Sequence, residues 1–262
     1  MDLKELRAGK TIENKGHHPW EFARFEVVHS LLKKHSKLNG LNIIDIGCGD
    51  TFFLETLSSR LKNCNYYGVD TAFDNELISF LKKRLSDKNI KLSKNISKLE
   101  KDNTKADIVF LLDVIEHLED DLGFLTTIKD SATFTNNTLL FITVPAFNLL
   151  YISRDKWLGH YRRYTLKGLK NILTKSNLRV MHSGYFFTNL FIARFINSLI
   201  EKIIKPDLNK ITGIGNWKER KLIDTFIKNS LVIDFRIFSI FKYFGFNIPG
   251  LSCFAICKKQ LL

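Results

Sequence analysis

The chain has 262 residues, of which 45% are hydrophobic, and this predicts a globular protein with one main core. The formal net charge of +13 favours an anionic partner. Charge alone does not distinguish nucleic acid, a phosphorylated substrate and a lipid surface. The four cysteines form no C-x-x-C pair, so no metal site is expected and a reduced, cytoplasmic setting is favoured. The N-terminal segment contains no apolar stretch of signal-peptide length, and no segment has the length of a membrane-spanning helix, so the chain is not predicted to cross a membrane.

Helical and strand patterns then alternate along the chain. A helix is predicted over residues 20–34, where Phe22, Phe25, Val28 and Leu32 have helical spacing. The next predicted strands are residues 41–47, 65–70, 106–113 and 138–145, and the helices between them lie near 52–62, 74–86 and 119–132. This repeat predicts a doubly wound α/β sheet, mostly parallel, with helices on both faces.

The pattern changes after Pro145. A loop is expected over 146–164, followed by a helix near 166–176, a strand at 178–186 and a last strand at 251–259. Between these two strands lie helical stretches that are rich in Phe and Ile and also carry Lys and Arg. Such helices fit a membrane interface, packing on the sheet, or a dimer contact, and the sequence leaves the oligomeric state open.

A glycine turn follows the first predicted strand, in "DIGCGD". Gly47 and Gly49 let the backbone approach a ligand closely, beyond the carboxyl end of the strand. Asp70 ends the next strand and could accept hydrogen bonds from two ribose hydroxyls, which indicates an adenosine-type cofactor. Phe52 stands at the position where the dinucleotide fingerprint needs a glycine, so a dinucleotide cofactor is disfavoured. The simpler alternative is a structural turn with Asp70 capping a helix.

These residues resemble the class I S-adenosylmethionine-dependent methyltransferases, in their small-molecule branch. The resemblance rests on "DIGCGD", on the acid of "YYGVD" and on "LLDVIEHLEDD". It implies a seven-stranded Rossmann-like fold whose last strand is antiparallel. The implied parts are an N-terminal helical segment at 1–40, a cofactor-binding core at 41–187, a helical insertion at 188–248 and the final strand at 249–262. Thr51 departs from the third glycine of many relatives, and Asp50 or Thr51 is expected to cap the following helix.

The resemblance also implies S-adenosylmethionine as cofactor. The residues assigned to it are Asp45, Gly47, Cys48, Gly49, Asp70 and Asp113. The glycine turn would surround the methionine part, Asp70 would bind the ribose, and Asp113 would lie near the amino-acid end. The adenine contact is left open between Asn95 and Ile96.

A narrower resemblance extends to both flanks of the core. "HHPWEFAR", "VPAFNLLYISRDKWLGHYRRYT" and "IPGLSCFAICKK" look like a bacterial subgroup associated with cell-surface glycan and lipid-linked saccharide pathways. It implies methylation of a small-molecule, saccharide or lipid-linked acceptor in the cytoplasm or peripherally at the inner face of the membrane.

The segment "HYRRYT" is the predicted acceptor loop, expected to arch over the acceptor side of the sheet. His160, with Tyr161 beside it, and His117 are the candidate catalytic residues, because a histidine can take a proton from a hydroxyl near neutral pH. The predicted acceptor-binding residues are Arg162, Arg163 and Tyr164. The alternatives are that the histidines are packed structural residues and that the arginines hold the loop by bonding acids such as Asp155.

Two rival functions remain at this stage. A nucleic-acid methyltransferase would use the same fold and suit the positive charge, but the chain has "LLDVIEH" in place of a proline-rich amino-methylase pattern such as N-P-P-Y, and no RNA-binding module is evident. A non-catalytic cofactor-binding protein is disfavoured because the binding motifs are intact.

Overall fold

The structure is a computed structural model that describes residues 16–204, 217 and 219–260. Its strands are β1 (Asn42–Ile46), β2 (Asn65–Val69), β3 (Ile90–Ser93), β4 (Ala106–Leu112), β5 (Phe134–Pro145), β6 (Leu178–Phe186) and β7 (Ser252–Lys259). Its α-helices are α2 (Pro19–His35), α3 (Phe52–Arg60), α4 (Asn75–Arg84), α5 (Ser97–Lys101), α6 (Asp121–Asp130), α7 (Ser153–Leu158), α8 (Leu166–Lys175), α9 (Thr188–Ile203) and α10 (Lys221–Phe241). Short 3-10 turns are η1 (Ile115–His117), η2 (Asn148–Leu150) and η5 (Lys242–Phe244).

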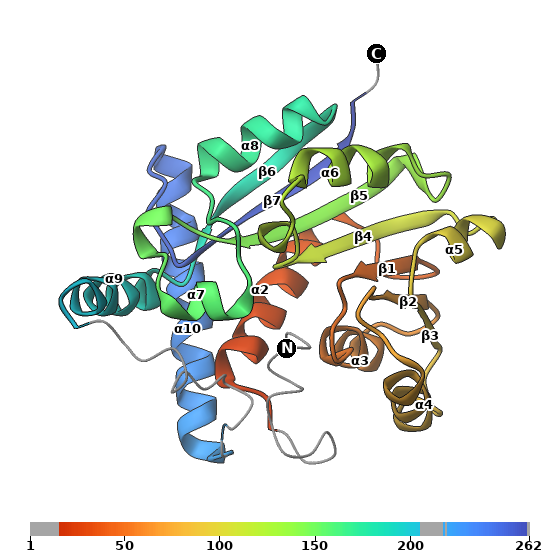
Figure 1. The fold of residues 1–262 in the computed structure, drawn as a ribbon, viewed down its shortest axis with the longest axis horizontal. Helices are drawn as coiled ribbons and strands as arrows, with labels where there is room; N and C mark the ends of the chain where they lie inside the picture. Colours follow the sequence, from red (N-terminus) through yellow and green to blue (C-terminus); the bar gives the residue numbers. More distant parts are fainter. Residues whose placement is uncertain (1–15, 205–216, 218, 261–262) are drawn as a thin grey trace. The chain divides into compact units, whose positions relative to one another are not determined.

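The strands form one seven-stranded sheet in the order β3-β2-β1-β4-β5-β7-β6 (Figure 1). The neighbours from β3 to β5 pair in parallel, and the sheet as a whole is mixed. The strand order reverses between β1 and β4, which is where open α/β sheets bind ligands. This architecture confirms the predicted fold class.

The chain divides into two compact units. The sheet unit comprises Ser36–Val144, Lys167–Ser183 and the described residues from Phe254 onward, and the helical unit comprises the described residues up to His35, Pro145–Leu166 and the described part of Gly184–Cys253. The loop after β5 therefore groups with α2, α9 and α10. The domain boundaries inferred from the sequence stay a prediction.

The core of the sheet unit consists of aliphatic and aromatic side chains from the central strands. Ile43, Ile44, Ile108, Phe110 and Leu111 are completely buried or nearly so. Continuous burial along β1 and β4 is typical of parallel strands covered on both faces. Helices α3 and α4 lie together beside β1–β3, and α6 and α8 lie together beside the opposite half of the sheet (Figure 1).

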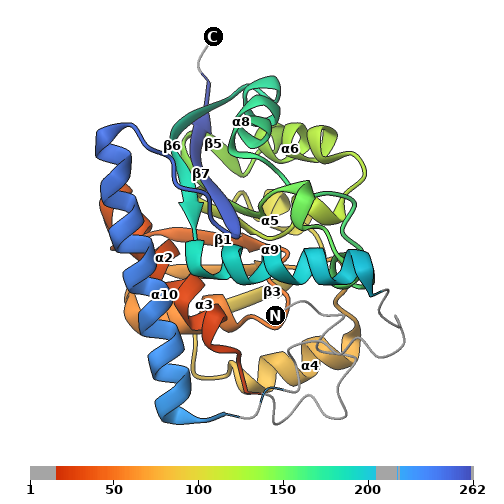
Figure 2. The same cartoon turned by 90° about the vertical axis from the view of Figure 1, so that its left-hand side faces the viewer.

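In the helical unit, α10 packs along α2, and α9 crosses α10 (Figure 2). Asp234 of α10 accepts hydrogen bonds from the backbone N–H groups of Thr188 and Asn189, at 2.8 and 3.0 Å. These bonds cap the first turn of α9, where backbone N–H groups lack partners within the helix. The predicted loop at 146–164 is in part wrong, because it contains η2 and α7.

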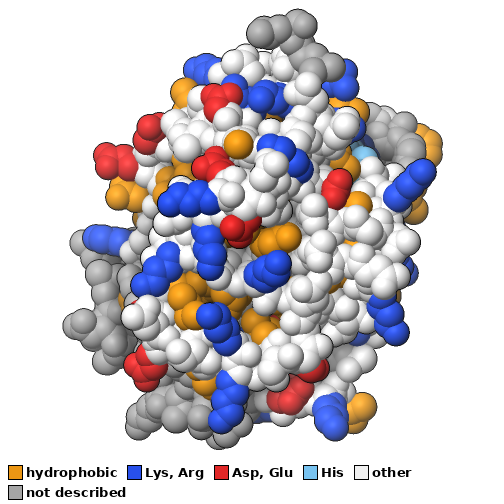
Figure 3. Space-filling view, turned by 90° about the vertical axis from the view of Figure 1, so that its right-hand side faces the viewer, with side chains coloured by type: hydrophobic (Ala, Val, Ile, Leu, Met, Phe, Trp, Pro, Cys, Tyr) orange, Lys and Arg blue, Asp and Glu red, His pale blue; other side chains and the backbone are white. Residues whose placement is uncertain are grey.

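Basic side chains do not gather into one patch on the face of the molecule drawn in Figure 3. There, Lys and Arg are interspersed with Asp, Glu and uncharged atoms. Among the residues that the structure describes, no helix combines the length and apolar character needed to cross a membrane.

Candidate functional site

The turn between β1 and α3 is built around two glycines in the left-handed region of the backbone, with φ of 75° at Gly47 and 54° at Gly49. A β-carbon on Gly47 would lie only 2.6 Å from Cγ2 of Val114, so no side chain fits there without rearrangement. The Gly47 N–H donates to the carbonyl of Val69 at 2.7 Å, which ties the turn to the end of β2. Glycine is thus required at position 47 by both conformation and space.

Asp70, just beyond β2, holds the same turn with its carboxylate. Its Oδ2 accepts from the Gly49 N–H and its Oδ1 from the Ala72 N–H, each at 2.9 Å. A carboxylate offers about four acceptor positions, which is more than these two bonds use. Asp70 is half-buried, which keeps the group accessible while its orientation is fixed. The sequence did not reveal that Asp70 also positions the glycine turn.

Cys48 lies between the two glycines with its thiol directed into the protein. Its Sγ would be 3.0 Å from a β-carbon on Gly68, and Leu92 would be 2.9 Å from the same position. Burial, reinforced by nearby Asp45, raises the pKa of the Cys48 thiol well above its ordinary value. The thiol is therefore a packing group, and any contribution of Cys48 to cofactor binding would come from its backbone.

Thr51, which replaces a glycine of many relatives, is fully buried in the left-handed region with φ of 67°. Its Oγ1 donates to Glu55 at 2.8 Å and accepts from Arg84 at 3.0 Å. Of the two capping residues expected for α3, Asp50 accepts from the Phe52 N–H at 3.3 Å, whereas Thr51 caps no N–H with its side chain. The bonds of Thr51 thus support a conformation that is costly for a β-branched residue.

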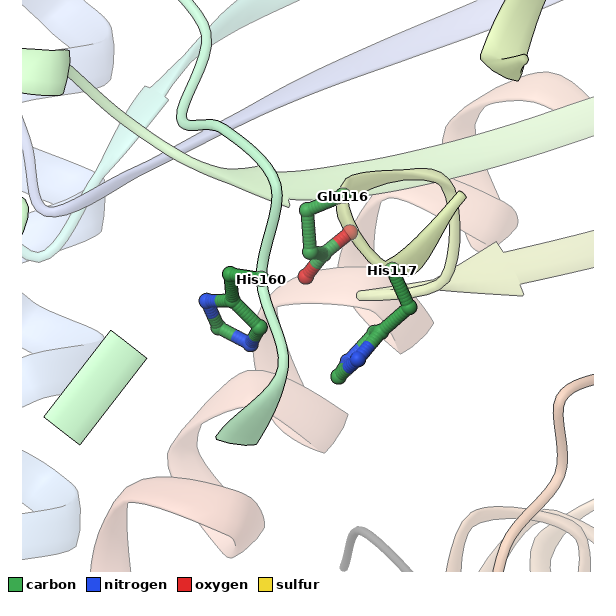
Figure 4. Close-up of side chains that lie close together, drawn as sticks. All are labelled: Glu116, His117 and His160. Carbon is green, nitrogen blue, oxygen red and sulfur yellow. The ribbon is translucent and has the colours of Figure 1, made fainter. Parts of the chain in front are cut away.

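Asp113 follows β4, at the edge of the sheet to which parallel strands direct their carboxyl ends. It also has a left-handed backbone, with φ of 57°, and its Oδ1 accepts from Thr143 of β5 at 3.1 Å. On the next turn, η1, Glu116 is fully buried and His117 is half-buried (Figure 4). Figure 4 also labels His160, which belongs to the helical unit.

After β3, the two candidates for the adenine contact differ in exposure. Asn95 is exposed, and its backbone carbonyl accepts from Ser93 at 2.8 Å, whereas Ile96 is half-buried. Neither observation selects between them, so the adenine contact stays a prediction.

The residues of the sheet unit that are predicted to bind the cofactor have a geometry that suits an adenosine-type group. The turn at Gly47 has no room for a side chain of its own, and Asp70 presents an oriented carboxylate at the end of the next strand. Both features lie beside the point where the strand order reverses. Asp45 is buried near the end of β1.

In the helical unit, Asp155 is the centre of a buried polar cluster. Its carboxylate accepts from Nδ1 of His160 at 3.0 Å, from Nε of Arg163 at 2.9 Å and from Nη2 of Arg194 at 2.6 Å. It also accepts from the Ile152 N–H at 2.9 Å. Burial alone would raise the pKa of Asp155, but the His160 hydrogen bond and the two guanidinium groups together hold it well below its ordinary value.

The predicted acceptor loop divides into exposed and buried residues. Tyr161 is 56% exposed and Arg162 is half-buried, whereas Tyr164 is buried. The Arg163 side chain is buried, pairs with Asp155 and donates to the carbonyl of Ala146 at 3.2 Å. These are the contacts of a loop-fixing arginine, which was the alternative considered for it; acceptor binding by this loop stays a prediction.

Three hydrogen bonds from α9 to residues just before this loop were missed in the sequence analysis. Arg194 bonds Asp155 and donates to the carbonyl of Leu150 at 3.3 Å, and Glu201 accepts from the Ser153 N–H at 3.0 Å. The available signal was an arginine within the apolar run "LFIARF", since a buried charge requires a partner. Burial lowers the pKa of Arg194 to about 10, and Asp155 opposes this shift.

Comparisons with solved structures agree with the fold. A putative sarcosine dimethylglycine methyltransferase from Galdieria sulphuraria has a similar structure with a TM-score of 0.56 at 10% identity, over 90% of this chain and 85% of that chain. Coclaurine N-methyltransferase bound to N-methylheliamine and SAH gives a TM-score of 0.56 at 13% identity, over 99% and 79% of the two chains. The [4+2]-cyclase SpnF gives a TM-score of 0.56 at 11% identity, over 95% and 86%.

At these identities the structural similarity shows the fold alone, and the presence of a cyclase illustrates that one fold supports several reactions. A sequence search of curated proteins found no match. The family itself is shown by a methyltransferase domain model that matches residues 20–183, more than half of the chain. The chain therefore belongs to the methyltransferase domain family and is an S-adenosylmethionine-dependent methyltransferase.

Proposed function

We propose that the enzyme methylates a hydroxyl group of a saccharide, lipid-linked or other small-molecule acceptor, with His160 as general base. The observation that carries this proposal is the hydrogen bond between Nδ1 of His160 and Oδ1 of Asp155, at 3.0 Å. A carboxylate can only accept here, so the bond keeps a proton on Nδ1, and in the neutral ring the lone pair then lies on Nε2. Asp155 would also stabilise the imidazolium formed when Nε2 takes a proton.

Bound S-adenosylmethionine supplies a methyl group that is already activated on a sulfonium sulfur. The residues of the chain then have to position the acceptor, exclude water and, for a hydroxyl, remove one proton. The proposed cofactor residues are the backbone from Asp45 to Gly49, the Asp70 carboxylate for the ribose, and Asp113 for the amino-acid end. His117 on η1 is the second candidate base.

Acceptor recognition is proposed for the exposed part of the loop. Tyr161 and Arg162 remain accessible, and an arginine can hold a phosphate or carboxylate group through two parallel hydrogen bonds. Arg163 is engaged by Asp155, so its proposed role is to orient His160 and the loop. The flanking segments that resemble a bacterial glycan and lipid-linked saccharide subgroup support an acceptor of that chemistry.

The first experiment identifies the acceptor class. A bacterial extract is incubated with methyl-labelled S-adenosylmethionine and the wild-type enzyme, and the label is then measured separately in lipid, saccharide, nucleic-acid and protein fractions. The proposal predicts label in the lipid or saccharide fraction. Label confined to nucleic acid would contradict it and favour the rival function.

The second experiment tests the base and uses as acceptor an unmethylated preparation of the fraction that took up label. His160→Ala is expected to lower turnover by about 10²–10⁴-fold while the dissociation constant of S-adenosylmethionine stays unchanged. Arg162→Ala is expected mainly to raise KM for the acceptor, because this contact would bind ground state and transition state alike. His35→Ala, at the end of α2, is the matched histidine control and should leave turnover unchanged. Wild-type turnover in His160→Ala would exclude His160 as the base and favour His117.

A further inference from the structure

The side of α10 that faces away from its packing partners is apolar. Leu222, Phe226, Ile233, Ile237 and Ile240 recur at spacings of three, four and seven residues and so share one face of the helix. Their exposed fractions run from 48% at Ile237 to 88% at Leu222. The opposite face carries Leu231 and Phe235, which are buried. A surface helix usually has the reverse arrangement, with its apolar stripe turned inward.

Helix α9 has a second exposed apolar stripe of the same kind. Its members are Ile192, Ile196, Leu199, Ile200 and Ile203. Ile203 is 84% exposed, whereas Ser198 on another face is buried. Exposed apolar stripes of this kind mark interaction sites in folded proteins. We refer to these five residues and the five of α10 as the α9–α10 surface.

The charges on the two helices are arranged asymmetrically. Asp224 accepts from Trp217 Nε1 and the Arg220 N–H, Asp234 caps α9, and Glu201 accepts from the Ser153 N–H. These acids are therefore used within the helical unit. The exposed cations of α9 and α10 are Lys202, Lys221 and Arg236. Glu201 and Asp224 are half-buried and Asp234 is buried, so the exposed charged side chains of the two helices are all basic.

We propose that the α9–α10 surface docks on the headgroup region of an anionic lipid bilayer. Apolar side chains enter the boundary between headgroups and acyl chains, and the flanking Lys and Arg bind anionic headgroups. A second copy of the chain fits less well, because a two-fold contact would bring the same positive patch against itself. The anionic bilayer instead complements both the apolar stripe and the charge.

Docking at this surface has a consequence for the reaction, which rests on the proposed function. Arg194 and Glu201 of α9 bond Asp155 and Ser153 of α7, and Asp155 in turn bonds His160. A bilayer-bound α9 would therefore hold the acceptor loop beside a lipid-linked substrate. Docking on a bilayer is measured without any acceptor, so the docking proposal and the proposed function can be refuted independently.

Vesicle flotation of the full chain tests the docking. Vesicles of phosphatidylcholine alone are compared with vesicles that also contain phosphatidylglycerol, at low and high salt. Wild-type protein should float with the anionic vesicles, and binding should weaken as salt screens the Lys and Arg side chains. Failure to float at low salt would overturn the proposal.

Two double variants locate the contact. Phe226→Ser with Ile237→Ser should lower the vesicle partition coefficient by about 10-fold or more, through loss of apolar burial. Lys221→Glu with Arg236→Glu should lower it by about 10–100-fold. The matched controls are Met181→Ser, an exposed apolar residue on β6, and Lys82→Glu with Lys83→Glu on α4, which change hydrophobicity or charge elsewhere.

Unchanged vesicle binding by either α9–α10 double variant, or equal loss in its control, would overturn the assignment of the surface. Sedimentation of the same proteins tests the alternative that a second copy of the chain occupies this surface. A wild-type dimer that dissociates in Phe226→Ser with Ile237→Ser, without vesicle binding by either protein, would assign the surface to a second copy. Circular dichroism should show wild-type helix content in all variants, because the substituted side chains are exposed or half-exposed.

Discussion

Asp155→Asn is expected to destabilise the enzyme more than any substitution of a surface acid. The Asp155 side chain is 1% exposed, and those of its ion-pair partners Arg163 and Arg194 are 6% and 16% exposed. Both carboxylate oxygens accept from donors, so either orientation of an asparagine amide would direct an NH₂ group at another donor. Two guanidinium groups would also lose their counter-charge.

Removing one partner of a buried ion pair costs about 3–5 kcal/mol, because the remaining charge is left uncompensated. For a chain of this size, that cost corresponds to a decrease in Tm of about 6–20 °C. Calorimetry and urea titration at pH 7 measure both quantities. Asp74→Asn is the matched control, because Asp74 is an exposed N-cap of α4 and asparagine caps equally well. Equal Tm values for Asp155→Asn and wild type would refute the assigned cluster.

The pH dependence gives an independent check. Folding lowers the pKa of Asp155 below its ordinary value of 3.8, so the ionised carboxylate favours the folded state. This contribution is present at pH values above the ordinary pKa and is lost as the pH falls through the lower pKa of the folded protein. The stability difference between wild type and Asp155→Asn should therefore shrink as the pH falls below about 4. A difference that grew in acid would have the wrong sign.

Two further predictions concern the glycine turn. Gly47→Ala should weaken S-adenosylmethionine binding and lower stability more than Gly40→Ala. Both positions have positive φ, but only at Gly47 would the added β-carbon clash, with Val114. Calorimetric titration and thermal unfolding measure the two effects, and equal effects of the two substitutions would contradict the clash. Thr51→Gly should be about 1 kcal/mol more stable than Thr51→Ala, because both lose the Oγ1 hydrogen bonds while only glycine relieves the left-handed backbone. Chemical denaturation decides the second comparison, and an alanine variant as stable as the glycine variant would argue against strain at Thr51.

Much of the fold was predictable because its signals are local. The strand predicted at 178–186 coincides with β6, and the helix predicted at 20–34 is α2 with one more residue at each end. β5 begins four residues earlier than the predicted Thr138, where polar residues interrupt the apolar run and the register with β4 shifts. Buried Thr138 donates to the carbonyl of Ala106, so its polarity is satisfied within the sheet.

The candidate sites were predictable only where chemistry and spacing coincide in a short segment. Gly47 and Asp70 stand in such segments, and the structure links them through Gly49 and β2. The Asp155 cluster depends on Arg194, which is 39 residues away along the chain, and no local pattern indicates which acid such a residue will meet. The left-handed conformation of Thr51 was equally hidden, since a β-branched residue disfavours it.

Calorimetric titration with S-adenosylmethionine tests the central claim most directly, with wild type, Asp70→Ala and the exposed-acid control Asp87→Ala compared at the same pH and salt. The account predicts that wild type and Asp87→Ala bind the cofactor equally, and that Asp70→Ala binds about 10–150-fold more weakly, through loss of charge-assisted hydrogen bonds worth about 1.5–3 kcal/mol. The absence of binding by wild type, or an unchanged dissociation constant in folded Asp70→Ala, would contradict it.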